Sequence, residues 1–171
     1  MVKAGRAPAQ FKGNERVEWG IALEDAIARA AAAKSGWTIR KGGYVTDATM
    51  RGLGATLDYL IVTPPGHTEA RPGPGVLEVK NVDWMVARDR WRDEPPVHIL
   101  LQLQHQLAAS GLSWGCVAAL VGGNDLRLYT YEARPAIIDL IRQRVEAFLA
   151  LPVVSGRGKP LIMRAWQWGE P

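Results

Sequence analysis

Apolar residues follow two spacings along this chain, one typical of helices and one typical of strands. The helical spacing, with capping residues at the ends, predicts helices over residues 14–36, 97–111 and 134–152. Runs rich in β-branched and apolar residues predict strands over residues 44–50, 53–63, 75–82, 114–121 and 126–132, the last two joined as a hairpin. This order predicts one mixed α/β domain over 1–171, with a core at about 14–151 and a tail, 152–171, without a clear period.

Two opposite charges stand inside the strand predicted at 75–82, which otherwise resembles a core strand. Glu78 and Lys80 are two residues apart, and strand side chains alternate between faces, so both point to the same face. Asp58 lies in the preceding predicted strand, and we expect the two strands to form an antiparallel pair. An unpaired carboxylate in a core is costly, so both acids need a partner.

The residues themselves leave two interpretations open. In the first, Glu78 and Lys80 form a buried ion pair and Asp58 lies at an exposed strand end. In the second, Asp58 and Glu78 hold a divalent cation together with the backbone carbonyl of Val79, because Mg²⁺ takes oxygen ligands and is commonly bound by one or two carboxylates. Lys80 would then face water or a phosphate, where it could assist proton transfer or offset negative charge.

Composition narrows the class of protein. The chain has 171 residues, 47% hydrophobic and 22% charged, which is typical of a soluble globular protein. Its formal net charge of +4 suits an anionic partner. We find no apolar stretch long enough for a signal peptide or membrane span, and we expect no membrane partner and a cytoplasmic location. The single cysteine, Cys116, excludes an internal disulfide and a multi-cysteine zinc site.

The order of these pieces resembles the PD-(D/E)xK nuclease superfamily, and more closely the YqaJ-type viral recombinase and phage-lambda exonuclease family. The matching positions, in chain order, are Trp19, Gly20, Glu24, Gly54, Ala55, Asp58, Glu78, Lys80, Gln102 and Gln104. The resemblance implies a restriction-endonuclease-like fold, in which helices flank a mixed central sheet. It spans about residues 14 to 132, most of the chain.

The resemblance also implies roles for individual residues. Asp58, Glu78 and the carbonyl of Val79 would bind a catalytic Mg²⁺, for which Mn²⁺ can substitute, and Glu24 would join the same cluster. Lys80 would be the catalytic lysine. Without the resemblance, Glu24 would be taken for an ordinary solvated helix residue.

Two glutamines of the predicted helix at 97–111 belong to the match. Gln102 and Gln104 are two residues apart, about 200° around a helix, so only one of them can approach the site closely. The resemblance assigns Gln104 as the catalytic glutamine that orients water or Lys80. Gln102 would then cap a strand or contact DNA.

Further residues are candidates for contact with DNA. Arginine suits phosphates and tryptophan can stack on unpaired bases. The connector predicted at 83–96 interleaves both types, although its acidic residues also fit a plain solvated segment. The candidate DNA contacts are Thr56, Arg88, Arg90, Trp91, Arg92, His98 and Gln102.

The resulting prediction is a metal-dependent deoxyribonuclease, a phage or prophage recombination exonuclease that acts on linear double-stranded DNA. The resemblance further implies a single-strand annealing protein as partner and a homo-oligomer, such as a trimer. Two alternatives stay open. One is a structure-specific or nicking endonuclease of the same fold, and the other is a catalytically idle DNA-binding or assembly module.

Overall fold

The computed structural model describes residues 14–62, 73–91, 93–151, 153–154 and 160–161. In chain order the elements are α1 (Glu15–Ser35), β1 (Thr38–Lys41), β2 (Tyr44–Thr46), β3 (Gly54–Thr56), β4 (Tyr59–Val62), β5 (Gly75–Val82), α2 (Trp84–Arg90), α3 (Val97–Ser110), β6 (Trp114–Val121), β7 (Asp125–Glu132), α4 (Pro135–Ala150), β8 (Val153–Val154) and β9 (Pro160–Leu161). Arg92 and most of the tail lie outside the described residues.

A five-stranded sheet in the order β1-β4-β5-β6-β7 forms the centre of the molecule. β5 and β6 run parallel, and all other neighbours in this sheet run antiparallel. Parallel neighbours need a crossover connection, which α2 and α3 supply. The predicted hairpin is confirmed, since β7 pairs with β6 along its whole length.

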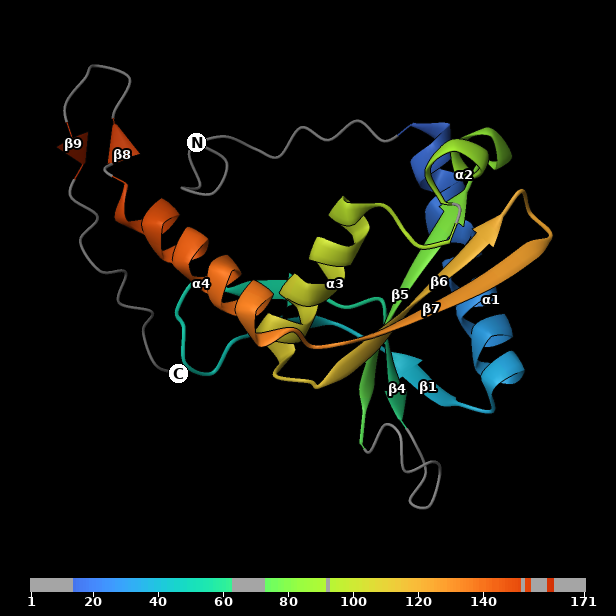
Figure 1. Cartoon of the computed structure of the whole chain (residues 1–171), viewed down its shortest axis with the longest axis horizontal. Coiled ribbons are helices and arrows are strands. Elements are labelled where there is room, and N and C mark those ends of the chain that lie inside the picture. Colours follow the sequence, from blue (N-terminus) through green and yellow to red (C-terminus); the bar gives the residue numbers. More distant parts are fainter. Residues whose placement is uncertain (1–13, 63–72, 92, 152, 155–159, 162–171) are drawn as a thin grey trace.

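The sheet lies between two helical layers (Figure 1). α1 covers one face, mainly over β5, and α3 covers the other, where it also contacts β2 and β3. α4 packs on the outer side of α3. This arrangement of helices around a mixed sheet confirms the predicted α/β class. None of the described helices combines the length and hydrophobicity that spanning a bilayer requires.

The predicted helix ends are correct because their local signals are strong. The side chain of Asn14 accepts a hydrogen bond from the Val17 N–H and so caps the start of α1. α1 ends at Gly36 and α3 at Gly111, both in the left-handed conformation, with φ of 68° and 70°. Glycine adopts this conformation without steric cost.

Three expectations about the elements were wrong. The strand expected at 53–63 is two strands, because β3 pairs with β2 in a separate small sheet while β4 pairs with β1 and β5. The strand expected at 44–50 is shorter, since β2 ends at Thr46. The charged connector at 83–96 contains the short helix α2, whose first turn is capped by the Asp83 side chain.

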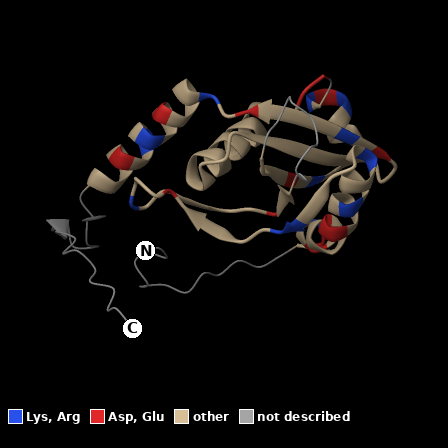
Figure 2. Ribbon diagram, turned by 90° about the horizontal axis from the view of Figure 1, so that it is seen from below, with Lys and Arg blue, Asp and Glu red and all other residues tan. Residues whose placement is uncertain are grey.

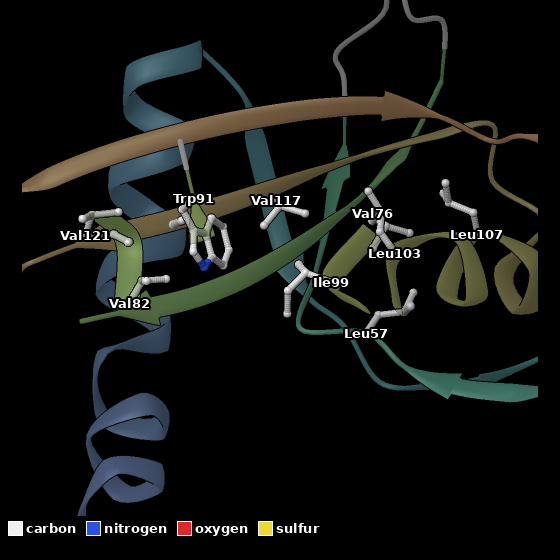
Figure 3. Packing of buried hydrophobic residues seen from close by; sticks show 11 residues of the cluster. Leu57, Val76, Val82, Trp91, Ile99, Leu103, Leu107, Val117 and Val121 are labelled. Atoms are coloured by element: carbon white, nitrogen blue, oxygen red, sulfur yellow. The ribbon is translucent and has the colours of Figure 1, made fainter. Parts of the chain in front are cut away.

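Side chains of β5 alternate between two hydrophobic clusters. Leu77 and Val79 face α1 and belong to one cluster, while Val76 and Val82 face α3 and belong to the other. Figure 3 shows the α3-side cluster, with Trp91 pointing into the space near Val82. Since strand faces alternate, Glu78 and Lys80 also face α3.

The side chain of Asp47 ties α4 to the turn between β2 and β3. Asp47 accepts hydrogen bonds from Thr49, Met50 and Arg142 of α4, and its side chain is only 3% exposed. The hydrogen bonds from Thr49 and Arg142 hold the pKa of Asp47 well below its usual range. The ionised form of Asp47 therefore stabilises the folded state.

We predict that Asp47→Ala lowers the free energy of unfolding by about 1–3 kcal/mol, the usual effect of losing hydrogen bonds to a buried charged group. Urea denaturation measures this loss, with Asp139→Ala, an exposed position on α4, as control. The loss should be fully present above about pH 4 and shrink below it, because the stabilising form is the carboxylate. Equal stability of both variants at neutral pH would contradict this role.

Candidate active site

Glu78 is buried in the middle of the sheet, with 1% of its surface exposed. Its Oε1 accepts hydrogen bonds from the Lys80 ammonium and from Gln102 Nε2, the latter at 2.7 Å. Its Oε2 accepts from Gln106 Nε2 at 2.5 Å. The Lys80 side chain is 26% exposed, so it links the buried carboxylate to solvent.

Asp58 lies at the point where the chain passes from β3 to β4, next to β5. Its Oδ2 accepts a hydrogen bond from the backbone N–H of Val79 at 2.9 Å. Burial, and next the negative charge of Glu78, raise the pKa of Asp58 to about 6, although the Val79 N–H acts in the opposite direction. Asp58 and Glu78 are therefore close enough to repel each other.

The oxygen atoms of Asp58, Glu78 and the Val79 carbonyl are suitable ligands for a hard divalent cation. In a strand, the N–H and C=O of one residue point to the same edge, so the Val79 carbonyl faces the edge at which Asp58 lies. Two carboxylates and a peptide carbonyl are the kind of oxygen ligands that Mg²⁺ takes. A cation between Asp58 and Glu78 would also relieve the repulsion that raises the Asp58 pKa.

Glu24 takes a different position from the one expected of a metal ligand. It forms an ion pair with Lys41, whose ammonium lies 4.5 Å from the centre of the Tyr59 ring. The charge of Glu24 still contributes to the raised Asp58 pKa, so it lies near the carboxylate pair without joining it. Among the described residues, no three His, Cys, Asp or Glu side chains form a group that could hold a metal ion.

α3 presents Gln102 and Gln106 to the site, whereas Gln104 alone was expected to approach it. Gln102 and Gln106 are four residues apart, hence on one helix face, and both donate to Glu78. Gln104 points elsewhere: its Nε2 donates to the Glu132 carbonyl, and its Oε1 accepts from the Arg134 N–H. The expectation that Gln104 orients water or Lys80 is therefore corrected. In this structure Gln104 joins the end of β7 to the start of α4.

Gln106 was missed by sequence reasoning, although the i, i+4 spacing from Gln102 could have indicated it. Its Nε2 also donates to the Thr56 carbonyl at 3.2 Å. Gln106 thus ties the segment that carries Asp58 to Glu78. Its own Oε1 is buried and has no hydrogen-bond partner among the described residues.

The candidate DNA contacts on α2 and at the start of α3 differ in their exposure. Trp91 is 4% exposed and packs against Tyr129, so it has no face free for a base, which corrects the expectation of stacking. Arg88 and Arg90 are exposed on α2, and Arg88 pairs with Asp89. His98 is exposed in the first turn of α3. Figure 2 shows Lys, Arg, Asp and Glu intermixed along α1 and α4, whereas α3 is tan.

A hollow of about 480 Å³ opens beside the carboxylate pair, and we call it the β3–α3 hollow. Its lining comes from β3, α3 and one residue of α4: Gly54, Ala55, Thr56, Leu101, Gln102, His105, Gln106 and Ile141. Of the candidate DNA contacts, Thr56 and Gln102 line this hollow.

The sequence was compared with models of known protein families. The model of the YqaJ-like viral recombinase domain matches residues 1–113, which include Asp58, Glu78 and Lys80. The chain belongs to this family. No curated protein sequence matches it at a significant level.

Solved structures share the fold of this chain. A complex of LHK-Exo with dAMP aligns with a TM-score of 0.67 and 22% identity, over 82% of this chain and 70% of that one. The structure of LHK-Exo, an alkaline exonuclease from Laribacter hongkongensis, gives 0.62 and 20%, over 81% and 69%. SSO0001 gives 0.50 and 14%, over 82% and 64%. The fold is that of the PD-(D/E)xK nucleases.

The raised Asp58 pKa predicts how the stability of the protein changes with pH. With chelator present, the folded state holds the Asp58 proton more tightly than the unfolded chain, whose aspartates ionise near pH 4. The Asp58 contribution to stability is therefore lost as pH rises from about 4 through 6. Urea denaturation of wild type and Asp58→Asn should show the variant gaining relative stability over this range. A gap that stays constant with pH would contradict this.

The two glutamines that contact Glu78 should differ in their effect on stability. Gln106→Leu leaves a buried Glu78 oxygen and the Thr56 carbonyl without this donor, so we expect a loss of about 1–3 kcal/mol in the free energy of unfolding. Gln102→Leu should cost clearly less, because Gln102 is exposed and water can replace its amide. Urea denaturation compares them, and equal losses would show that Gln106 has no special tie to the core.

Proposed function

We propose that this domain is a divalent-metal-dependent deoxyribonuclease. The proposal rests on one observation above all: Asp58, which lies just before β4, is close enough to Glu78 on the paired strand β5 for the charge of Glu78 to raise the Asp58 pKa, and Lys80 shares the Glu78 face. Membership in the YqaJ-like viral recombinase domain family supports the same function.

In the proposed mechanism, Asp58, Glu78 and the Val79 carbonyl would hold the metal ion. Bound Mg²⁺ or Mn²⁺ would supply Lewis acidity for hydrolysis of the phosphodiester. Gln102 and Gln106 hold the two oxygens of Glu78 in place from α3. Such fixed orientation avoids reorganisation when substrate binds.

In this mechanism Lys80 is the residue that contacts the substrate. Its ammonium has three donors, of which Glu78 accepts one, and its side chain is partly exposed. It can therefore donate to the attacking water or to a phosphate oxygen and offset the charge that builds up on the phosphoryl group. Lys80 would act on the substrate, while Asp58 and Glu78 act on the cation.

The preferred substrate is linear double-stranded DNA, degraded from an end. Support comes from the fold shared with LHK-Exo, which is an alkaline exonuclease. In a recombination role the product would pass to a single-strand annealing protein in the cytoplasm, with the nuclease as a homo-oligomer such as a trimer. A structure-specific or nicking endonuclease is the alternative within the same chemistry.

A second candidate function follows from how completely Glu78 is paired. Lys80, Gln102 and Gln106 together satisfy both of its oxygens without any cation. Such a set of contacts would also suit a catalytically idle DNA-binding or assembly module, in which Glu78 and Lys80 are a structural ion pair. Activity measurements separate the two functions.

The deciding experiment combines conservative variants with two DNA forms. Purified full chain is incubated with Mg²⁺ or Mn²⁺ and either end-labelled linear duplex or closed circular DNA. We expect cleavage of the linear form, loss of cleavage in chelator, and at least a hundredfold loss in Asp58→Asn and Glu78→Gln, of the order that removal of a catalytic electrostatic group costs. Glu132→Gln, at the exposed end of β7, is the matched control.

Lys80→Ala separates chemistry from metal binding. It should lose most of its turnover but still bind Mn²⁺ in calorimetry, because the ammonium is not a ligand. Cleavage of circular DNA would favour the endonuclease. Wild-type protein without any cleavage, and with no Mn²⁺ binding that depends on Glu78, would favour the idle module.

A further inference from the structure

Lys41 and Glu24 form an ion pair beside the carboxylate pair, and the proposed mechanism uses neither of them. Lys41 is the last residue of β1, the outer strand of the central sheet, and Glu24 lies on α1. The Lys41 ammonium donates to Glu24 Oε1. The Glu24 side chain is only 22% exposed, whereas that of Lys41 is 62% exposed. The pair thus joins α1 to β1 and places a positive charge next to Glu24.

A second contact holds Lys41 in place. Its ammonium lies 4.5 Å from the centre of the Tyr59 ring, a distance typical of a cation–π interaction. Tyr59 is the cross-strand partner of Lys41 in the pairing of β1 with β4. The Tyr59 hydroxyl donates to Asp25 Oδ1 at 2.9 Å, and Asp25 Oδ2 accepts from Arg29 Nε at 2.7 Å. The ring is therefore fixed from α1, and the ring in turn fixes the ammonium.

The end of β1 lies directly against the segment that carries Asp58. The N–H of Gly42, the residue after Lys41, donates to the Asp58 carbonyl at 2.9 Å. The approach is so close that a Cβ atom on Gly42 would lie 2.3 Å from the Leu57 carbonyl oxygen. Asp58 also directly precedes Tyr59, over whose ring the Lys41 ammonium lies. Lys41 is therefore held next to one of the two carboxylates of the site.

Glu24 belongs to the same charged neighbourhood. Burial and the charge of Glu78 raise the pKa of Asp58 most, and the charge of Glu24 raises it further. The hydrogen bond to Glu24 raises the pKa of Lys41, to which the charge of Asp58 adds. Glu24 is thus close enough to act on Asp58 through its charge while its carboxylate is bound to Lys41.

A cation held by Asp58 and Glu78 would compete with Lys41 for Glu24. A free carboxylate beside such a cation can replace one of its water ligands, because Mg²⁺ and Mn²⁺ take oxygen ligands. Glu24 is not free, since its transfer would break an ion pair and leave the ammonium facing a divalent charge. A hydrogen bond between charged groups shifts an equilibrium of this kind by about tenfold.

We infer that Lys41 is a positioning residue that binds Glu24 and so keeps this carboxylate away from a cation held by Asp58 and Glu78. The inference rests on the proposed function, which supplies the cation, and it gives a role to a residue of β1. With Glu24 withheld, the cation keeps a coordination position for water or for a phosphate oxygen of DNA. The same arrangement lowers the affinity for the cation, because one carboxylate fewer binds it.

Calorimetric titration of the full chain with Mn²⁺ tests the inference. Lys41→Gln releases Glu24, so we expect this variant to bind Mn²⁺ about tenfold more tightly than wild type does. Glu24→Gln alone should leave the wild-type affinity unchanged, and the double variant of Lys41→Gln and Glu24→Gln should lose the gain. Lys41→Arg keeps a cation beside Glu24 and should bind Mn²⁺ as wild type does.

Arg40→Gln is the matched control. It removes the same charge from the neighbouring position of β1, where the side chain is exposed and points to the other face. A gain equal to that of Lys41→Gln would show only a general effect of charge and would overturn the inference. A gain that persists in the double variant, or weaker Mn²⁺ binding in Glu24→Gln alone, would overturn it as well. Circular dichroism and urea denaturation verify that all variants fold as wild type does.

The number of water ligands on bound Mn²⁺ is the second readout, which a merely structural role of Lys41 would not change. Electron–nuclear double resonance in D₂O counts these waters. We expect Lys41→Gln to have one water ligand fewer than wild type and the double variant to regain it, because a carboxylate oxygen replaces water in the shell. The same number in wild type and in both variants would reject the inference.

The two readouts distinguish failure of the inference from failure of the proposed function. Mn²⁺ binding that is lost in Glu78→Gln but unaffected by Lys41→Gln rejects the role of Lys41 and leaves the proposed metal site intact. If Glu78→Gln binds Mn²⁺ as wild type does, or wild type binds none, the proposed metal site fails and the inference fails with it.

Discussion

Burial of the Glu78 carboxylate is the constraint on which the site and much of the fold depend. A charge in the centre of a sheet is tolerated only when it is paired and hydrogen-bonded. β5 supplies Lys80 from the same strand face, and α3 must cross that face so that Gln102 and Gln106 reach the two oxygens. The packing of α3 on β5 and β6 is therefore both the hydrophobic core and the means of satisfying one charge.

The surroundings of Asp58 favour its neutral form, which holds a proton. Glu78 has several donors, whereas Asp58 has one backbone N–H and a like-charged neighbour, and its pKa rises. This asymmetry between two neighbouring carboxylates is typical of functional sites, where groups are held in unfavourable states for a task.

Much of the site could be predicted from the sequence, because side chains of a strand alternate with a period of two and a loop joins the two neighbouring strands. The period of two placed Glu78 and Lys80 on one face, and the loop between two apolar runs placed Asp58 beside them, as the structure has it. The choice of glutamine did not follow, because a resemblance assigned Gln104 while helix geometry brings Gln102 and Gln106 to Glu78. Trp91 was also misjudged, since its charged neighbours in the chain gave no sign that its ring lies in the core.

Local sequence determined where the helices begin and end, which strand faces are apolar and which residue types carry charge, because caps, left-handed glycines and side-chain periods act over a few residues. Tertiary structure alone decided the division of residues 53–63 into β3 and β4. The first part pairs with β2 in the small sheet, whereas the second part pairs with β1 and β5 in the central sheet. It also decided that Glu24 pairs with Lys41 and that Gln104 joins β7 to α4. Such partners come from elements far apart in the chain, and a residue's own neighbours in sequence carry no information about them.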